Sequence, residues 1–212
     1  MTNRVIRQPE FSIIALLGEN MSILPQIEKR RALRAIDPRP IGKEVLVRLA
    51  QAAHLAPSCA NSQSWRIVTV VEPARLEALK ATLSGGNYWA KKAPAIAAFV
   101  TSIDWDARLD GGRDYAPFDL GMAAMNYQLQ AVEEGLYAHP IAGFDPAAAK
   151  LALGIPETAI LETLVILGYP GDSSGLSEKH LAGESSPRDR KSLDEVSAFD
   201  AWNEKLAPKP KG

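Results

Sequence analysis

Three arginines near the start of the chain have the chemistry to bind a phosphate group. Arg30, Arg31 and Arg34 fall within the segment RRALR. If this segment is helical, Arg30 and Arg34 share a face, and their planar guanidinium groups suit phosphate oxygens better than ammonium groups would. Arg188 and Arg190, in SPRDRKSL, form a second basic group that could converge on the same anion. The alternative for both groups is a solvated charged surface.

A polar connection, APSCANSQSW, links an apolar helical pattern to a strand-like run. It is longer and richer in amide and hydroxyl groups than a turn requires, so we expect something polar to dock there. Its single thiol follows a helix and precedes a strand, which favours a small packing residue over a reactive cysteine. The polar residues of the connection are Ser58, Cys59, Asn61, Ser62, Gln63 and Ser64.

A third stretch, HPIAGFD, could bring the backbone close to a ligand. Pro140 and Gly143 allow such an approach and aim N–H groups outward, although the same residues also fit an ordinary loop turn. His54, His139 and His180 have no neighbour in sequence that would form a nucleophile and base pair. The chain also has no GxSxG, P-loop or GxGxxG motif, which argues against a hydrolase or a nucleotide triphosphatase.

Helical and strand-like patterns alternate along the chain. Residues 44–56 have apolar side chains at helical spacing, and residues 66–71, 95–100 and 164–169 are short apolar runs of strand length. Residues 118–136 form a helical pattern that is apolar around most of its circumference, which predicts burial on several sides and a second subunit as the extra partner. We expect its methionines to fill the core. The stripe of this helix consists of Phe118, Met122, Met125, Leu129, Val132 and Leu136.

Composition indicates a globular protein of one main domain. The chain has 212 residues, 46% apolar and 23% charged, with a net charge of -1, which favours neither nucleic acid nor anionic membranes as a partner. One cysteine and no zinc-like spacing predict a cytoplasmic protein without a structural metal. The apolar run FSIIALLG is cut short by Glu19 and lacks the features of a signal peptide, and no segment is long enough to span a bilayer. We expect an arm over 1–21, a domain over 22–200 and a tail over 201–212.

Together, these stretches resemble the FMN-dependent nitroreductase family over about residues 27–196. RRALR is similar to the family's R-[RH]-S-x-[RK] element, and APSCANSQSW is similar to A-P-S-x-x-N-x-Q-P-W. PIAGFD resembles P-I-E-G-F-D, and RDRKSL resembles K-x-R-x-P-L. The resemblance implies an α+β fold, a mixed sheet flanked by helices, in a domain-interlocked homodimer with FMN at the subunit interface.

The resemblance also implies roles for individual residues. The first arginine segment would meet the FMN phosphate, ribityl chain and pyrimidine edge, and the second basic group would complete the phosphate site. Ala142 and Gly143 would offer N–H groups to flavin N5 and O4 beside Pro140 and Ile141, and Asn87 matches a family asparagine. Pro57, Ser58 and Cys59 would approach the isoalloxazine from the partner subunit, while Asn61 and Gln63 would hold that loop or touch the ring. The expected cofactor-binding residues are Arg30, Arg31, Ala32, Arg34, Pro57, Ser58, Cys59, Asn61, Gln63, Asn87, Pro140, Ile141, Ala142, Gly143, Arg188 and Arg190.

Four positions depart from the family pattern: Ala32 replaces a serine, Ala142 a glutamate, and Ser64 and Ser192 prolines. The resemblance predicts an oxidoreductase that passes hydride from NAD(P)H through FMN to a quinone, nitroaromatic or other flat acceptor. The flavin would carry the chemistry without a catalytic acid or base. Two alternatives remain open: an enzyme of the same fold acting on a specific metabolite or fragmenting flavin, and a redox-silent flavin-binding protein. The segment 101–118 matches no family pattern, and we expect it to form a pocket lid.

Overall fold

A computed structural model describes residues 22–208 of the chain. Contacts divide the chain into two compact units, one formed by Leu24–Ser185 and the other by the residues on either side of it. The predicted arm over 1–21 and the last four residues of the predicted tail lie outside the described residues. The predicted domain limit at residue 200 stays a prediction.

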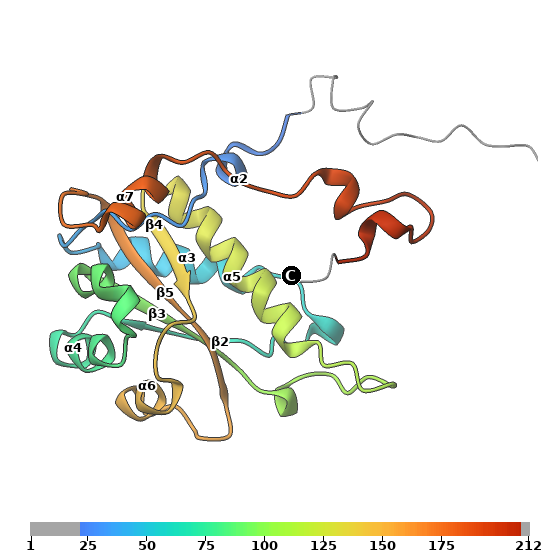
Figure 1. The fold of residues 1–212 in the computed structure, drawn as a ribbon. Helices are drawn as coiled ribbons and strands as arrows, with labels where there is room; N and C mark the ends of the chain where they lie inside the picture. The colour runs from blue at the N-terminus through green and yellow to red at the C-terminus, as the bar shows by residue number, and fades with distance from the viewer. Residues whose placement is uncertain (1–21, 209–212) are drawn as a thin grey trace, which may run out of the picture. The chain divides into compact units, whose positions relative to one another are not determined.

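The first unit contains a five-stranded sheet (Figure 1). β5 is its central strand, pairing with β1, β3 and β4, and β2 pairs with the far side of β3. Three of the strands were expected from their apolar runs, whereas β1 and β4 were not. The strands are β1 (Ile36–Asp37), β2 (Arg66–Val70), β3 (Ala95–Thr101), β4 (Tyr137–Ile141) and β5 (Ile160–Pro170).

The expected α+β fold with helices flanking a sheet is confirmed, and the strand directions correct one detail of it. Every pairing among the described strands is antiparallel, so this chain forms an antiparallel sheet, where a mixed one was expected. β2 and β3, like β4 and β5, follow each other in sequence and lie side by side. In each pair the chain returns along its neighbour in the opposite direction, so no parallel crossover is needed.

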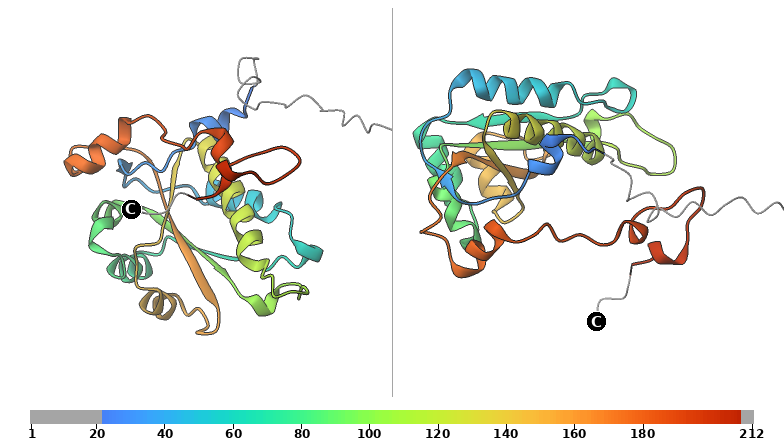
Figure 2. Two further views of the ribbon diagram at one scale, coloured as in Figure 1. Left: turned by 45° about the vertical axis from the view of Figure 1, so that its right-hand side comes forward. Right: turned by 90° about the horizontal axis from the view of Figure 1, so that it is seen from above.

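Helices and short 3-10 turns cover both faces of this sheet (Figure 2). α3 lies with α5, and α4 lies with α6. Proline occupies an early position in α2, α4, α5 and α6, where its missing N–H would have no helical partner. The helical elements of this unit are α2 (Pro25–Lys29), α3 (Lys43–His54), η1 (Cys59–Asn61), α4 (Pro73–Ala81), η2 (Gly85–Lys92), η3 (Ile103–Trp105), α5 (Ala116–Glu133), α6 (Pro146–Leu153) and α7 (Glu178–Ser185).

The period-two alternation of β3 divides the core into two clusters. Ala95, Ala97 and Phe99 pack with residues of α3 and α5 on one side, which we call the α5 face. Ile96 and Ala98 pack on the other side, which we call the α4 face, with residues of α4, η2 and α6. All seven residues of β3 are buried, so this strand lies at the centre of both clusters.

Helix α5 uses its alanine-rich side to contact the sheet. Ala123, Tyr127 and Ala131 are fully buried, and the Tyr127 ring meets Phe99 edge-on at 5.3 Å. The predicted stripe lies mainly on the other side, where Phe118 is 60% exposed and Met125 is 44% exposed. The expectation that Met125 fills the core is therefore wrong for the single chain. An apolar helix face that the subunit itself leaves uncovered fits the predicted second subunit.

The described part of the second unit is short and has two 3-10 turns, η4 (Leu193–Glu195) and η5 (Glu204–Leu206). Ser192 and Glu195 form a reciprocal capping box at the start of η4. Lys205 Nζ lies 3.0 Å from Asp194 Oδ2 and joins the two turns. Over residues 22–208, no helix has the length and apolar character needed to cross a bilayer, and no cluster of His, Cys, Asp or Glu side chains is suited to a metal ion.

Candidate functional site

The arginine segment is extended, so the condition under which Arg30 and Arg34 would share a helix face is not met. α2 ends at Lys29, and Arg30 caps it with a ψ of 119°. The N–H of Arg34 donates to Glu184 Oε1 at 2.9 Å, and that of Ala35 donates to Glu184 Oε2 at 3.2 Å. Because the Glu184 carboxylate takes these two donors, they are not available for helical bonding, and the segment is held against α7 instead.

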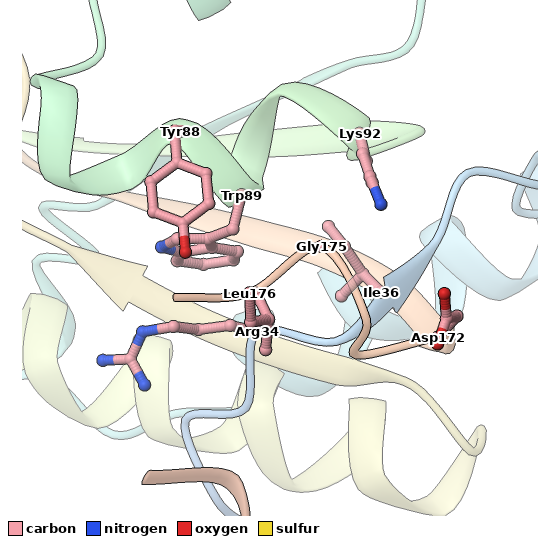
Figure 3. Close-up of a pocket in the computed structure, with 8 residues that line it drawn as sticks. All are labelled: Arg34, Ile36, Tyr88, Trp89, Lys92, Asp172, Gly175 and Leu176. Carbon is pink, nitrogen blue, oxygen red and sulfur yellow. The ribbon is translucent and has the colours of Figure 1, made fainter. Parts of the chain in front are cut away.

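The guanidinium groups of this segment lie beside α7 and η2. Arg31 Nη2 donates to the carbonyl of Gly183 at 3.3 Å, and Arg34 lies over the Trp89 ring at 5.9 Å from its centroid. Figure 3 shows Arg34 extended below Tyr88 and Trp89 at one end of a pocket, with Lys92 toward its other end. The pocket has a volume of about 50 Å³. A cation over an aromatic face is stabilised by the ring quadrupole, which keeps the Arg34 side chain extended.

Tyr88 and His180 attach α7 to η2. The rings stack with centroids 5.5 Å apart, and His180 Nδ1 lies 3.2 Å from the Tyr88 hydroxyl oxygen. The same oxygen accepts a hydrogen bond from the N–H of Ser177 at 2.7 Å. Hydrogen bonding with Ser177 lowers the pKa of Tyr88, and the charge of Arg34 acts in the same direction. Through these contacts, α7 is fixed beside the arginine segment.

His139 connects the arginine segment to β4. It is buried, its ring centroid lies 4.7 Å from that of Trp89, and its Nδ1 lies 3.1 Å from the carbonyl oxygen of Leu33. Burial lowers the pKa of His139 to about 4, and the positive charges of Arg34 and Arg30 add to that effect. The imidazole is therefore neutral at pH 7. Because a carbonyl oxygen can only accept, we assign the ring proton to Nδ1.

The PIAGFD stretch begins on a strand, which corrects the reading of the whole stretch as a loop. Tyr137–Ile141 is β4, and Pro140 fits there because β4 pairs only with β5 among the described strands. The Gly143 carbonyl accepts hydrogen bonds from Ser84 N at 2.9 Å and Asn87 Nδ2 at 2.8 Å. A Cβ on Gly143 would lie 2.7 Å from Asn87 Nδ2, so a larger residue would displace that amide.

The N–H groups of this loop are available to a ligand. Within residues 22–208, Ala142 and Gly143 accept hydrogen bonds through their carbonyls but donate none through their N–H groups. Ala142 is exposed, and Gly143 is half-buried. The indole Nε1 of Trp89 is also a buried donor without a partner in the described residues. Free donors and guanidinium groups beside one another suit a flat ligand with carbonyl oxygens and an anionic end.

The structure therefore brings most of the expected residues together on the α4 face. The cluster surrounding them includes Ile36, Trp89, Ile141 and Phe144. Arg30 is half-buried and close enough for its charge to act on His139, whereas Ala32 is exposed. The members of this group are Arg30, Arg31, Ala32, Arg34, Asn87, Ile141, Ala142 and Gly143, whereas Pro140 alternates with them along β4 and faces the α5 side with Ala138.

The loop 57–63 lies elsewhere, between Ala56 and Trp65 of the α5-face cluster. The N–H of Cys59 donates to Asp119 Oδ2 at 3.0 Å, and Thr101 at the end of β3 donates to the carbonyl of Ser64 at 3.0 Å. Within one chain, the loop thus adjoins the α5-face cluster, whereas Arg34 lies over Trp89 of the α4-face cluster. The loop carries Pro57, Ser58, Cys59, Asn61 and Gln63.

Asn61 and Gln63 hold the loop, one of the two roles expected for them. Gln63 Nε2 donates to Asn61 Oδ1 at 3.1 Å, and the N–H of Gln63 donates to Ser58 Oγ at 3.0 Å. The Ser58 hydroxyl therefore has a structural partner inside its own loop. Cys59 is a free, half-buried thiol.

Arg188 and Arg190 belong to the second unit. Arg190 Nη1 donates to the carbonyl of Asp189 at 2.6 Å. The role of these two arginines at a phosphate stays a prediction.

The segment 101–118 has little regular structure between η3 and α5 and surrounds a hollow of about 260 Å³. Arg66 lies over the Trp105 ring at 5.2 Å, and Tyr115 meets Phe118 edge-on at 5.3 Å. Charged side chains line most of the hollow, among them Asp104, Arg108 and Arg113. The predicted function of this segment as a lid stays a prediction.

Reading the sequence missed several residues that organise both regions. His139 directly precedes the PIAGFD element, a signal that was available. Asp119 is a charged residue four positions before Ala123 and eight before Tyr127, so it falls on the buried side of α5. No sequence signal linked Glu184 to the arginine segment, because that contact spans about 150 residues. The missed residues are Tyr88, Trp89, Asp119, His139, His180 and Glu184.

Comparison with known proteins gives matches over most of the chain. The model of the Nitroreductase family matches residues 27–85 and 72–169. An "NADH dehydrogenase" of Thermus thermophilus is 32% identical over 68% of this chain and 84% of its own length. A "5,6-dimethylbenzimidazole synthase" of Rhodobacter capsulatus is 28% identical over 73% of this chain and 86% of its own.

A crystal structure described as "the oxidoreductase containing FMN" superposes with a TM-score of 0.77 at 27% identity, covering 96% of this chain and 99% of that one. The matched region of the family model includes the arginine segment, Asn87, the loop 57–63 and the PIAGFD element. Taken with the α+β fold, these matches show that the chain belongs to the nitroreductase family.

Proposed function

We propose that the protein is an NAD(P)H-dependent FMN oxidoreductase that reduces a quinone, nitroaromatic or similar flat acceptor by a ping-pong mechanism. The observation that carries this proposal is the group on the α4 face. There Arg31, Arg34 and Asn87 lie with the free N–H donors of Ala142 and Gly143. The Thermus relative is named for NADH, and the superposing oxidoreductase for FMN, which agrees with both proposed cofactors.

The residues present fit FMN. The phosphate requires fixed positive charge, which Arg30 and Arg31 supply, and the isoalloxazine requires donors along its carbonyl edge. Gly143 has no Cβ, so the Asn87 amide packs against its backbone, and the N–H groups of Ala142 and Gly143 supply such donors. When bound, FMN would supply the chemistry by accepting hydride from the nicotinamide and passing electrons to the acceptor.

The chain's own contribution is to bind, orient and supply charge. Arg34, held extended by Trp89, would stabilise negative charge at the pyrimidine edge. The N–H groups of Ala142 and Gly143 would orient the central ring. His139 is neutral at pH 7 and keeps Leu33 in place without adding a proton donor to the site. No side chain is required to act as a general acid or base.

We further propose a homodimer with an FMN site at each subunit interface. Support comes from the uncovered apolar face of α5, where Phe118 and Met125 are exposed, and from the position of the loop 57–63. Because this loop adjoins the α5-face cluster and Arg34 lies on the α4-face cluster, we expect the loop to reach the FMN held by the other subunit.

The test is the absorption spectrum of the purified protein under anaerobic conditions, before and after addition of NADPH or NADH. We expect bound FMN, released on denaturation, that bleaches with at least one donor and recovers on addition of menadione. A protein that cannot be reconstituted with FMN would refute the proposal. Bound FMN that neither donor bleaches would identify a redox-silent flavin-binding protein.

A second candidate is a flavin-fragmenting enzyme, favoured by the similarity to the Rhodobacter synthase. The two candidates differ in the fate of the flavin. An oxidoreductase returns FMN unchanged after many turnovers, whereas a fragmenting enzyme consumes it. Chromatography of the flavin after prolonged incubation with NADPH and oxygen distinguishes them, because only the second gives a benzimidazole product.

A further inference from the structure

The loop 57–63 has an unusual concentration of backbone strain. Ala60, Asn61 and Gln63 have φ values of 49°, 56° and 49°. Residues other than glycine adopt this left-handed region rarely, because their Cβ comes close to the carbonyl oxygen. Such conformations persist only where the surroundings enforce them, and they cluster at functional sites.

Two side chains from outside the loop bind it directly, and a third binds the residue that follows it. Asp119 of α5 accepts from the N–H of Cys59, and Asp106 accepts from the Ser62 hydroxyl at 3.1 Å. Thr101 binds the Ser64 carbonyl at the end of β3. Of the two carboxyl groups, only that of Asp119 contacts the loop backbone, immediately after Ser58.

Burying Asp119 at this position lowers the stability of the fold. The residue is fully buried, and its Oδ1 atom has no hydrogen-bond partner within residues 22–208. Burial raises the pKa of Asp119, the charge of Asp106 raises it further, and the hydrogen bond from Cys59 opposes both. A buried, half-satisfied carboxyl group destabilises a fold, so its presence on a helix side with Leu120, Ala123 and Ala131 points to a role other than stability.

We propose that Asp119 is a positioning residue for the reaction. Its buried carboxyl group fixes the N–H of Cys59, keeps the loop in its left-handed conformation and thereby places Ser58 and Cys59 against the isoalloxazine of the other subunit. The inference rests on the proposed function for its catalytic effect. The effect on loop conformation stands independently of that function.

Two substitutions separate the hydrogen bond from the packing. In Asp119→Asn, the amide oxygen can still accept from Cys59, whereas in Asp119→Leu the volume is kept and the acceptor is lost. We expect Asp119→Leu to slow anaerobic flavin reduction by NADPH about tenfold to a hundredfold, as small misplacements of reacting groups do. Asp119→Asn should stay within about threefold of the wild type, since an amide oxygen restores most of a single hydrogen bond.

Gln128→Leu is the matched control, because Gln128 is also a buried polar residue of α5 but donates to its own helix at the carbonyl of Ala124. It should lower stability without slowing flavin reduction. Equal slowing in Gln128→Leu and Asp119→Leu, or an Asp119→Asn variant as slow as Asp119→Leu, would overturn the positioning role.

Amide hydrogen exchange of the loop gives a readout that does not need activity. In dimers confirmed by light scattering, Asp119→Leu should accelerate exchange over Cys59–Gln63, while Asp119→Asn and Gln128→Leu should not. If the wild type oxidises neither NADPH nor NADH, the proposed function fails and only the conformational part of the inference survives. Unchanged exchange in Asp119→Leu would refute that part as well.

Discussion

The two faces of the sheet hold their polar groups in different ways. On the α4 face, none of the described candidate residues has a positive φ. There the polar groups are held by buried rings and charges around Arg34, Trp89 and His139. On the α5 face, the constraint is carried by the backbone, in the left-handed residues of the loop 57–63. The first arrangement should respond to pH and added volume, and the second to backbone freedom.

The largest expected effect tests whether the two faces serve one site across the dimer. One variant carries Arg30→Ala and Arg34→Ala, and the other carries Ser58→Trp, whose indole should block the neighbouring flavin. Each is expected to be inactive as a homodimer. In mixed dimers, one of the two sites combines intact arginines with an intact loop. With random pairing, half of the dimers are mixed, so co-expression should restore about a quarter of wild-type activity.

Differential tags on the two chains isolate the mixed dimers, which should then show about half of wild-type activity. Folded but inactive mixed dimers would show that the loop serves the arginine group of its own chain.

The second prediction concerns the pH response of the α4 face. The pKa of His139 falls from 6.5 to about 4 on folding, so between these values the unfolded chain binds a proton that the folded chain does not. Stability therefore decreases as pH falls through this window, by about 3 kcal/mol in total. His139→Gln should remove this slope in urea titrations of the FMN-free protein between pH 7 and pH 4.

His54→Gln is the control, because His54 is exposed on α3. The slope should persist in this variant. A slope of unchanged size in His139→Gln would mean that other titrating groups carry the pH response.

The third prediction adds one carbon to the α4 face. In Gly143→Ala, the new Cβ would displace the Asn87 amide from the Gly143 carbonyl. Loss of one hydrogen bond destabilises by about 1 kcal/mol, and FMN should bind about fivefold more weakly. Fluorescence titration with FMN measures the change.

Gly121→Ala serves as the comparison, because nothing lies within 4 Å of a Cβ at this position in α5. Alanine should stabilise the helix slightly and leave FMN affinity unchanged. Equal FMN affinities for the two variants would show that Gly143 does not contribute to FMN binding.

The smallest effect is expected from relieving strain on the α5 face. Ala60→Gly removes the Cβ from a left-handed residue, and the gain is offset in part by the greater freedom of glycine in the unfolded chain. Stability should change by less than about 1 kcal/mol, while flavin reduction slows because the loop is held less firmly.

The same change at Ala74, an exposed helical residue of α4, should destabilise by about 1 kcal/mol. An Ala60→Gly variant that loses as much stability as Ala74→Gly would show that the loop is unstrained.

Sequence patterns predicted the parts of this molecule whose determinants are local. The apolar runs gave β2, β3 and β5, and the motifs located Arg34, Asn87 and Gly143. The extended arginine segment was mistaken for a possible helix, because Glu184, which takes its N–H groups, lies far along the chain. The strain at Ala60 left no trace in sequence, since alanine has no preference for a left-handed conformation. β4 was missed because a proline inside a short run argues against a strand, whereas Pro140 occupies a position of β4 where no N–H is needed.

The burial of β3 along its whole length has a consequence for how motion spreads through the molecule. Its amides are bonded on both sides, to β2 and to β5, and should exchange with deuterium only when the whole unit unfolds. Thr101, which ends β3, binds Ser64 directly after the loop 57–63, and His139 is paired with Ile166 of β5. Both regions are thus attached to the slowest-exchanging strands, so either can open locally while the other keeps its geometry.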